Sequence, residues 1–152
     1  MYIFVVGALI FVLPIVSVVS EMASQGVPLS LALIGKWFAF WSVGVRLLSA
    51  GIKQAVQPAY TARVILGLKS DEVLLVIREL GFANMAIGIV GVASLLLPAR
   101  LPAAALAGGL FYGLAAVNHA LQAHRGRHEN IAMGSDAFAS VVLLAGLVGL
   151  LR

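Results

Sequence analysis

The residues of this chain that could do chemistry lie within long apolar segments or at their ends. The stretch from Arg78 to Asn84 opens an apolar run that continues to Leu97. Charged and amide side chains in such a run are costly in lipid unless they find partners inside the protein. Similar residues occur in three other apolar segments, so we interpret them together as one intramembrane site. The predicted ligand-binding residues are Arg46, Lys53, Gln54, Gln57, Arg78, Glu79, Asn84, Asn118, His119, Ser135 and Asp136.

The charges in this set do not balance. If all five ionise, Arg46, Lys53 and Arg78 outnumber Glu79 and Asp136 by one positive charge. The surplus would attract an anionic or carbonyl-rich ligand such as a lipid headgroup, a carboxylate or a quinone. Arg46 lies about 10 Å deeper than Lys53 at helical rise, so we expect it to be the cation that lacks a protein partner. In the alternative interpretation, ion pairs hold the helices in register and surplus charge snorkels to headgroups.

The histidines favour hydrogen bonding over metal or haem chemistry. His119 could relay protons or bind haem iron, but we expect it to hydrogen-bond Glu79 or Asp136. A haem usually needs a second histidine on a facing helix, and the other segments of the site have none. His124 and His128 fall in a predicted polar loop with no evident third ligand. No residue is marked as a catalytic nucleophile, Ser135 included, and the absence of cysteine excludes thiol catalysis.

Composition identifies an integral membrane protein of one domain. The chain has 152 residues, of which 62% are hydrophobic and 11% are charged, and its mean hydropathy is +1.07. A soluble domain is nearer half apolar and a quarter charged. The net charge of +4 is scattered along the chain. No basic stripe with interleaved aromatic residues is present, which argues against nucleic-acid binding.

The hydrophobic segments predict an all-α bundle of five transmembrane helices. The predicted spans cover residues 2–20, 36–57, 71–97, 101–122 and 131–151. Residues 21–35 are predicted to be a loop or a short interfacial piece. The connector of residues 60–69 contains Val64, Ile65 and Leu66 and is predicted to form a short surface helix. Ser70 is expected to cap the third span.

The charges of the loops favour a cytoplasmic N-terminus. Arg63, Lys69, Arg125 and Arg127 fall on one side, whereas Lys36, Arg100 and Arg152 fall on the other. This topology places the polar residues of four spans at one depth, near the cytoplasmic side. The opposite ends of these spans are predicted to be almost purely apolar.

Helical spacing predicts which residues share a face. Arg46, Lys53 and Gln57 line one face of the second span, since they are separated by seven and four positions. Gly81, Asn84, Gly88 and Gly91 form a stripe of small residues on the third span. Such a stripe lets another helix approach closely and brings Asn84 within hydrogen-bonding range.

Several of these motifs resemble known membrane proteins. The stretches 40–46, 51–54, 57–58, 78–84 and 135–136 together resemble a family of small, uncharacterised bacterial membrane proteins. More loosely, the last four spans are similar to the DoxX-type four-helix fold, through Arg46, Gly51-Ile52-Lys53 and Glu79. The extra N-terminal span departs from that fold. The DoxX resemblance implies a link to membrane oxidoreductase systems and to quinones, but it supplies no catalytic residue.

Three functions are compatible with these patterns. The first is binding of a small amphiphilic or anionic ligand, with a lipid or a quinone as the possible cofactor. The second is an accessory subunit of a membrane complex, with a purely structural polar layer and with glycine stripes that dock another membrane protein or a second copy. The third is a proton-coupled carrier that uses Glu79 or Asp136. The expected location is the bacterial inner membrane, and an enzymatic activity is not favoured.

Overall fold

The computed structural model describes residues 2–123 and 126–152, and the described residues form helices joined by short loops without any strand. The predicted all-α class is therefore confirmed. The elements in chain order are α1 (Tyr2–Gly7), η1 (Ala8–Val12), α2 (Leu13–Gln25), α3 (Leu31–Phe38), η2 (Ala39–Val45), α4 (Arg46–Val56), α5 (Pro58–Tyr60), η3 (Thr61–Ile65), α6 (Val73–Leu96), η4 (Pro98–Arg100), α7 (Leu101–Ala120) and α8 (Arg127–Leu150).

Within the described part of the chain, five helices are long and apolar enough to cross a membrane, as the sequence predicts. They are Ile3–Gln25, Leu31–Val56, Val73–Leu96, Pro98–Ala120 and Arg127–Leu150. The first and second spans continue without a break through the π-helical segments η1 and η2. The second and fifth spans begin about one turn earlier than predicted, at Leu31 and Arg127.

The predicted loop over residues 21–35 is largely wrong. The first span continues through Glu21 to Gln25 and ends at Gly26, whose φ of 66° is left-handed and suits glycine. The second span then begins at Leu31, where the Ser30 hydroxyl accepts a hydrogen bond from Leu33 N–H at 3.1 Å. Only residues 26–30 separate the two helices.

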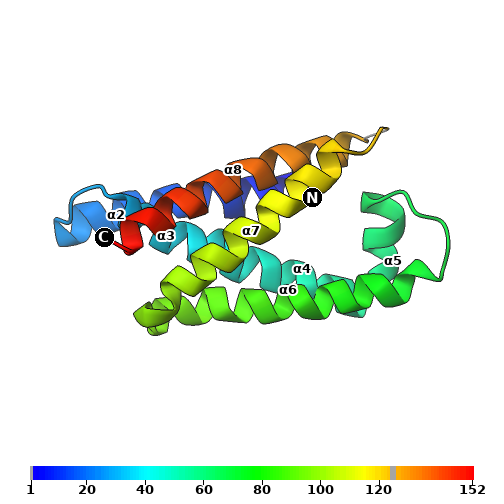
Figure 1. The fold of residues 1–152 in the computed structure, drawn as a ribbon, viewed down its shortest axis with the longest axis horizontal. Coiled ribbons are helices and arrows are strands. Elements are labelled where there is room, and N and C mark those ends of the chain that lie inside the picture. Colours follow the sequence, from blue (N-terminus) through cyan, green and yellow to red (C-terminus); the bar gives the residue numbers. More distant parts are fainter. Residues whose placement is uncertain (1, 124–125) are drawn as a thin grey trace.

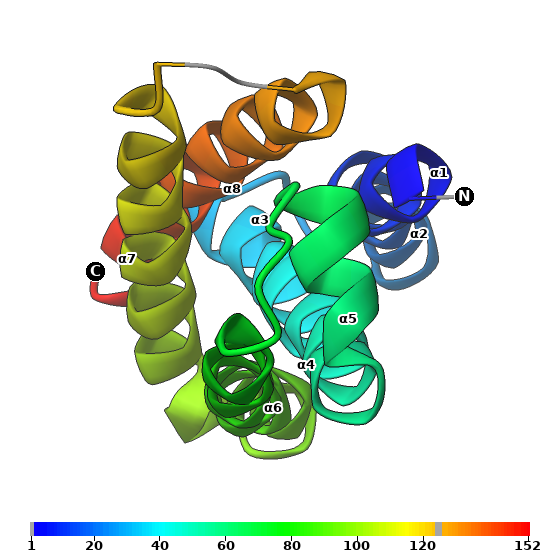
Figure 2. The same ribbon diagram turned by 90° about the vertical axis from the view of Figure 1, so that its right-hand side faces the viewer.

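The second span is the centre of the bundle. Its three parts pack against every other span: α3 against α2 and α8, η2 against α6 and α7, and α4 against α6. Figure 2 shows the remaining helices around it. Four of its residues, Phe38, Ala39, Val43 and Leu47, belong to the buried apolar core.

Two glycine contacts bring the second span close to its neighbours. A Cβ atom added at Gly91 of α6 would lie 2.5 Å from Gly44 N in η2. A Cβ atom added at Gly146 of α8 would lie 2.5 Å from Gly35 Cα in α3. Distances this short exclude any side chain at these positions, so the backbones themselves are in contact. The glycine stripe of α6 permits close approach, as predicted, and the partner is the second span.

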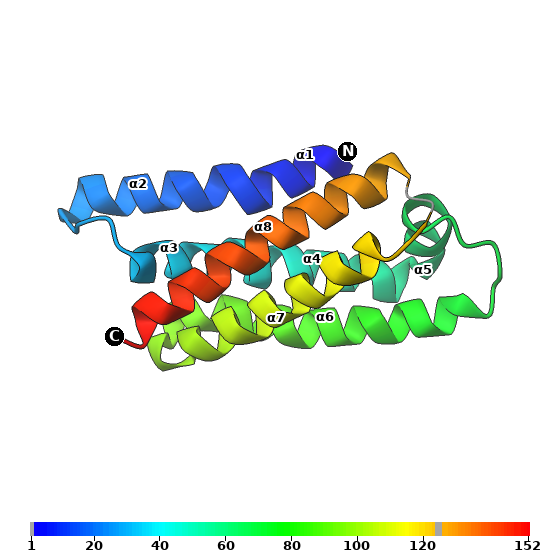
Figure 3. The same cartoon turned by 45° about the horizontal axis from the view of Figure 1, so that its top comes forward.

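The helices form two packed groups that diverge along the bundle. α6 packs along η2 and α4, and α8 packs along α7 and α3. Figure 1 shows α4 and α6 separating from α7 and α8 toward α5 and η3. We call this the α5 end, and the end with residues 26–30 the opposite end (Figure 3). The predicted short helix of the connector is present as α5 and η3, although it begins at Pro58.

Candidate functional site

The centre of the candidate site is an ion pair between the second and fifth spans. Arg46 Nη2 donates to Asp136 Oδ1 at 2.9 Å. The side chains are 13% and 8% exposed, respectively. The expectation that Arg46 lacks a protein partner is therefore wrong. The depth of Arg46 along the second span does not indicate a partner, because its partner Asp136 belongs to the facing fifth span.

A π-helical turn in the second span ends directly before Arg46. Arg46 N–H bonds to Trp41 O, five residues back, as well as to Val43 O. The carbonyl of Ser42, which an α-helix would pair with Arg46 N–H, accepts a hydrogen bond from the Tyr112 hydroxyl instead. The Arg46 guanidinium lies 4.8 Å from the Tyr112 ring centroid. Tyr112 thus binds the π-helical turn with its hydroxyl and faces the cation with its ring.

A second π-helical turn extends this network into the first span. Leu13 N–H bonds to Ala8 O, five residues back, just before Pro14. Proline lacks an N–H and clashes with the preceding turn, which accounts for a local rearrangement here. The carbonyl of Leu9 accepts a hydrogen bond from Ser42 Oγ at 3.4 Å. Ser42, Arg46, Tyr112 and Asp136, which we call the buried polar centre, therefore connect four of the five spans.

A second group of polar residues lies nearer the α5 end. Lys53 Nζ lies 4.1 Å from the centroid of the Tyr60 ring. Asn84 Nδ2 donates to Gln54 Oε1 at 2.7 Å, which joins α6 to α4 as the predicted stripe requires. The other amide atom, Asn84 Oδ1, is buried without a hydrogen-bond partner among the described residues. Gln57 is exposed beside Pro58. We call Lys53, Gln54, Tyr60 and Asn84 the Lys53 group.

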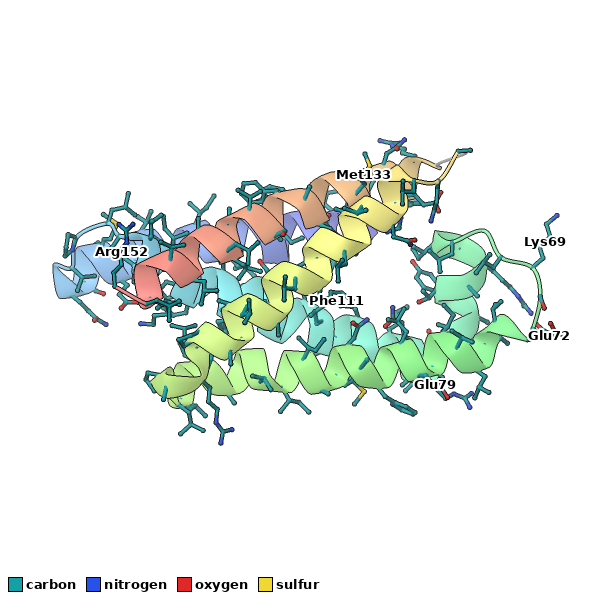
Figure 4. The ribbon with its side chains drawn as sticks, viewed as in Figure 1. Lys69, Glu72, Glu79, Phe111, Met133 and Arg152 are labelled. Atoms are coloured by element: carbon teal, nitrogen blue, oxygen red, sulfur yellow. The ribbon has the colours of Figure 1, made fainter. Side chains whose placement is uncertain are left out.

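Arg78 and Glu79 are not part of either group. Both are exposed on α6, and Figure 4 shows Glu79 on the side that faces away from α7 and α8. Gly81 and Asn84 face the second span, and Glu79 lies about 200° around the helix from Gly81 at about 100° per residue. In the described part of the chain neither residue forms an ion pair. The expectation that they share a charge network with Arg46 and Asp136 is not met.

The residues of the last two spans are divided between the centre and the surface. Asn118 is exposed, whereas His119 is half-buried and lies close enough to Asp136 to interact with it electrostatically. The predicted bond from His119 to Glu79 is excluded by the outward position of Glu79. Ser135 is buried, and its hydroxyl donates to Ala132 O at 3.0 Å in its own helix. His128 belongs to the first turn of α8, while His124 and Arg125 lie outside the described residues.

The comparison with known proteins decides the family. The sequence profile of DUF6790, a family of unknown function, matches residues 1–151. The chain belongs to the DUF6790 family. The predicted membership of an uncharacterised family is therefore confirmed. No curated protein and no solved structure matches the chain, so the function of this DUF6790 member has to be argued from its geometry.

This DUF6790 member has a polar cluster at the opposite end that the sequence analysis missed. Glu21 of α2 accepts hydrogen bonds from Lys36 Nζ at 2.8 Å and from Trp37 Nε1 at 2.7 Å. One turn deeper, Trp41 Nε1 donates to Ser17 Oγ at 2.9 Å. The spacing of Ser17, Glu21 and Ser24 could have revealed it, because these positions share one helical face. We call this the Glu21 cluster.

Proposed function

We propose that this protein binds a small amphiphilic molecule with an anionic or carbonyl-bearing head at the Lys53 group. The proposal rests on the surroundings of the Lys53 ammonium group. Within the described residues no carboxylate lies within ion-pair distance of its ammonium, which faces the ring of Tyr60 instead. A half-buried cation in a membrane span is a functional-site hypothesis by default.

The charge count now favours Lys53 over Arg46 as the ligand-binding cation. Asp136 neutralises Arg46, so the surplus positive charge on this face of α4 belongs to Lys53. Arg46 lies seven residues deeper on the same face. An anionic or carbonyl oxygen at Lys53 would add a hydrogen bond to a charged donor, which is stronger than one between neutral groups.

The chemistry of the head is shared by a carboxylate, an anionic lipid headgroup and a quinone carbonyl. Each presents oxygen acceptors to the ammonium and has an apolar body that the surrounding lipid can accommodate. The resemblance to DoxX-type proteins also includes Lys53 and adds a reason to test quinones. The amide pair of Gln54 and Asn84 lies at nearly the same level, since Gln54 directly follows Lys53, and it supplies neutral hydrogen-bonding groups.

The Arg46–Asp136 pair favours one alternative, an accessory subunit whose polar layer is structural. The pair and the bonds of Tyr112 and Ser42 connect helices and leave little of the buried polar centre for a ligand. The glycine stripe, however, does not support docking of a further membrane protein. Gly81, Gly88 and Gly91 already contact the second span.

We also propose that the α5 end lies in the cytoplasm of a bacterial cell, with the protein in the inner membrane. In the sequence, Arg63, Lys69, Arg125 and Arg127 fall on that side, and Lys36, Arg100 and Arg152 fall on the other, where Lys36 is paired with Glu21. The chain has no cysteine, so single cysteines placed at Lys69 and Arg152 report the two sides separately. A membrane-impermeant thiol reagent on whole cells should label position 152 and spare position 69.

Native mass spectrometry of gently extracted protein tests the ligand. The wild-type protein should retain one amphiphile that accumulates above its share of the membrane lipids. Lys53→Met should reduce its occupancy by about tenfold or more, as expected for the loss of one charge-assisted hydrogen bond. Lys69→Met removes the same charge from an exposed loop and is the matched control. If both variants retain what the wild type retains, or the wild type retains nothing, the proposal is wrong.

A further inference from the structure

A polar groove lies between the first and second spans at the opposite end of the bundle. Its volume is about 530 Å³, and it is independent of the Lys53 group. Polar residues of α2 and the last turn of α3 line most of it: Ser17, Ser20, Glu21, Ser24, Lys36 and Trp37.

The sequence concentrates hydroxyl groups on one face of α2. Ser17, Ser20 and Ser24 are separated by three and four positions, so they follow the same helical face as Glu21. The Ser17 hydroxyl accepts a hydrogen bond from Trp41. Ser20 and Ser24 are exposed and have no hydrogen-bond partner among the described residues. A polar face of this kind on a membrane span indicates contact with polar groups outside the helix.

The groove has no net charge, and several hydrogen-bond donors in it are free. Lys36 Nζ uses two of its three N–H bonds on the two oxygens of Glu21, and one N–H remains. The Ser20 and Ser24 hydroxyls add two further donors. Glu21 balances the charge of Lys36, so a ligand with a net negative charge would leave an unbalanced anion here.

The depth and the rim of the groove fit a membrane lipid. Glu21 lies four residues before the end of α2, about 6 Å along the helix axis at 1.5 Å per residue. That depth corresponds to the boundary between headgroups and acyl chains, where tryptophans such as Trp37 are enriched. One turn deeper, Val16 of α2 also lines the groove and is 55% exposed. An acyl chain could continue along this apolar surface.

We propose that this groove binds the headgroup of a zwitterionic phospholipid. The phosphodiester oxygens accept hydrogen bonds from Lys36, Ser20 and Ser24, and the cationic amine of the headgroup lies beside Glu21. A zwitterion supplies the acceptors that the free donors require and leaves the net charge of the groove at zero. An anionic lipid supplies the acceptors without balancing charge, and a neutral glycolipid has no phosphodiester.

Lipid enrichment in nanodiscs tests this assignment. The full-length protein is placed in discs with equal parts of phosphatidylethanolamine, phosphatidylglycerol and a neutral diacyl glycolipid, then released and weighed by native mass spectrometry. We expect phosphatidylethanolamine to be the retained lipid. The same measurement on Lys53→Met removes any anionic lipid held at the Lys53 group. Retention of phosphatidylglycerol or the glycolipid by this variant at a level equal to or above that of phosphatidylethanolamine, or of no lipid, would overturn the proposal.

A serine variant distinguishes this groove from general lipid contact. Ser20→Ala with Ser24→Ala leaves the Glu21–Lys36 pair intact and should reduce the retained phosphatidylethanolamine about tenfold, the factor expected for two lost hydrogen bonds. Ser49→Ala, at an exposed position of α4, is the matched control and should change nothing. Unchanged retention in the double variant would contradict the assignment. Lys53→Met should leave this lipid bound, which separates the result from a failure at the Lys53 group.

Discussion

Two of the ion pairs among the described residues are of similar length but lie in very different settings. Arg46 and Asp136 lie 2.9 Å apart in the middle of the bundle, and Lys36 and Glu21 lie 2.8 Å apart near its opposite end. The first pair joins the second span to the fifth, 90 positions along the chain, whereas the second joins consecutive spans 15 positions apart. Lys36 is 33% exposed, more than twice the exposure of Arg46.

The contrast shows that the burial of an ion pair determines how much the pair contributes to stability. A buried pair is costly to break, because the remaining charge has no solvent, although it adds little over a well-packed apolar pair. A pair near the interface can exchange partners with water or headgroups and contributes less. We therefore assign the Arg46–Asp136 pair to helix register and the Glu21–Lys36 pair to lipid contact.

The largest expected effect is the loss of one partner of the buried pair. Asp136→Ala leaves the Arg46 guanidinium buried beside Tyr112 without its carboxylate. The free energy of unfolding should fall by about 3–5 kcal/mol, which denaturant titration in detergent micelles would measure. A decrease below about 1 kcal/mol, in the range of exposed ion pairs, would show that this pair is not buried in the membrane.

Replacing both partners should recover most of that loss. Arg46→Met combined with Asp136→Leu fills the site with apolar side chains of comparable length, and such replacements are often neutral or stabilising. The double variant should therefore unfold at a higher denaturant concentration than either single variant. If its loss equals the sum of the two single losses, the residues do not interact in the folded protein.

Removing the hydroxyl that serves the π-helical turn should have an intermediate effect. Tyr112→Phe keeps the ring against Arg46 but leaves the buried Ser42 carbonyl without the Tyr112 hydroxyl. The expected loss is about 1–3 kcal/mol, the cost of an unsatisfied buried polar group. Thermal unfolding in detergent would measure it, and an unchanged midpoint would mean that the turn does not depend on this bond.

The smallest expected effect belongs to the opposite end. Glu21→Gln keeps an acceptor for Trp37 and removes only the charge that faces Lys36. The loss should stay near or below about 1 kcal/mol and shrink as salt is added. Arg63→Ala, which breaks the well-exposed pair with Asp71, is the control and should have no measurable effect. A loss from Glu21→Gln as large as that from Asp136→Ala would remove the distinction between the two pairs.

Hydropathy predicted the fold because each span is a local pattern. The five apolar segments and the glycine stripe of α6 could be read from a window of residues, and the structure has both. The extension of the first span through Glu21 was missed because a charged residue after an apolar run resembles a loop. Its charge is satisfied by Lys36, which the local pattern of the first span does not include.

The site was harder to predict because it depends on how each helix is rotated. Arg46 and Asp136 were both predicted, but nothing along the chain indicated that they pair with each other. Arg78 and Glu79 were included for their depth. The spacing of Glu79 from Gly81 places it on the outer face of α6, whereas Arg78, three positions before Gly81, lies beside the glycine stripe and is nevertheless exposed. The π-helical turns had one sequence signal, Pro14, and it indicated only the first.

Photo-crosslinking at Tyr60 tests the central claim, an amphiphile bound at Lys53, most directly. A benzophenone amino acid at this position keeps an aromatic ring beside the Lys53 ammonium, and the same substitution at Leu75, which is 63% exposed on α6, samples the surrounding lipid. We predict that position 60 yields one predominant amphiphile adduct in cell membranes and that Lys53→Met abolishes it. If positions 60 and 75 yield the same mixture of bulk lipids, the Lys53 group is not a ligand site.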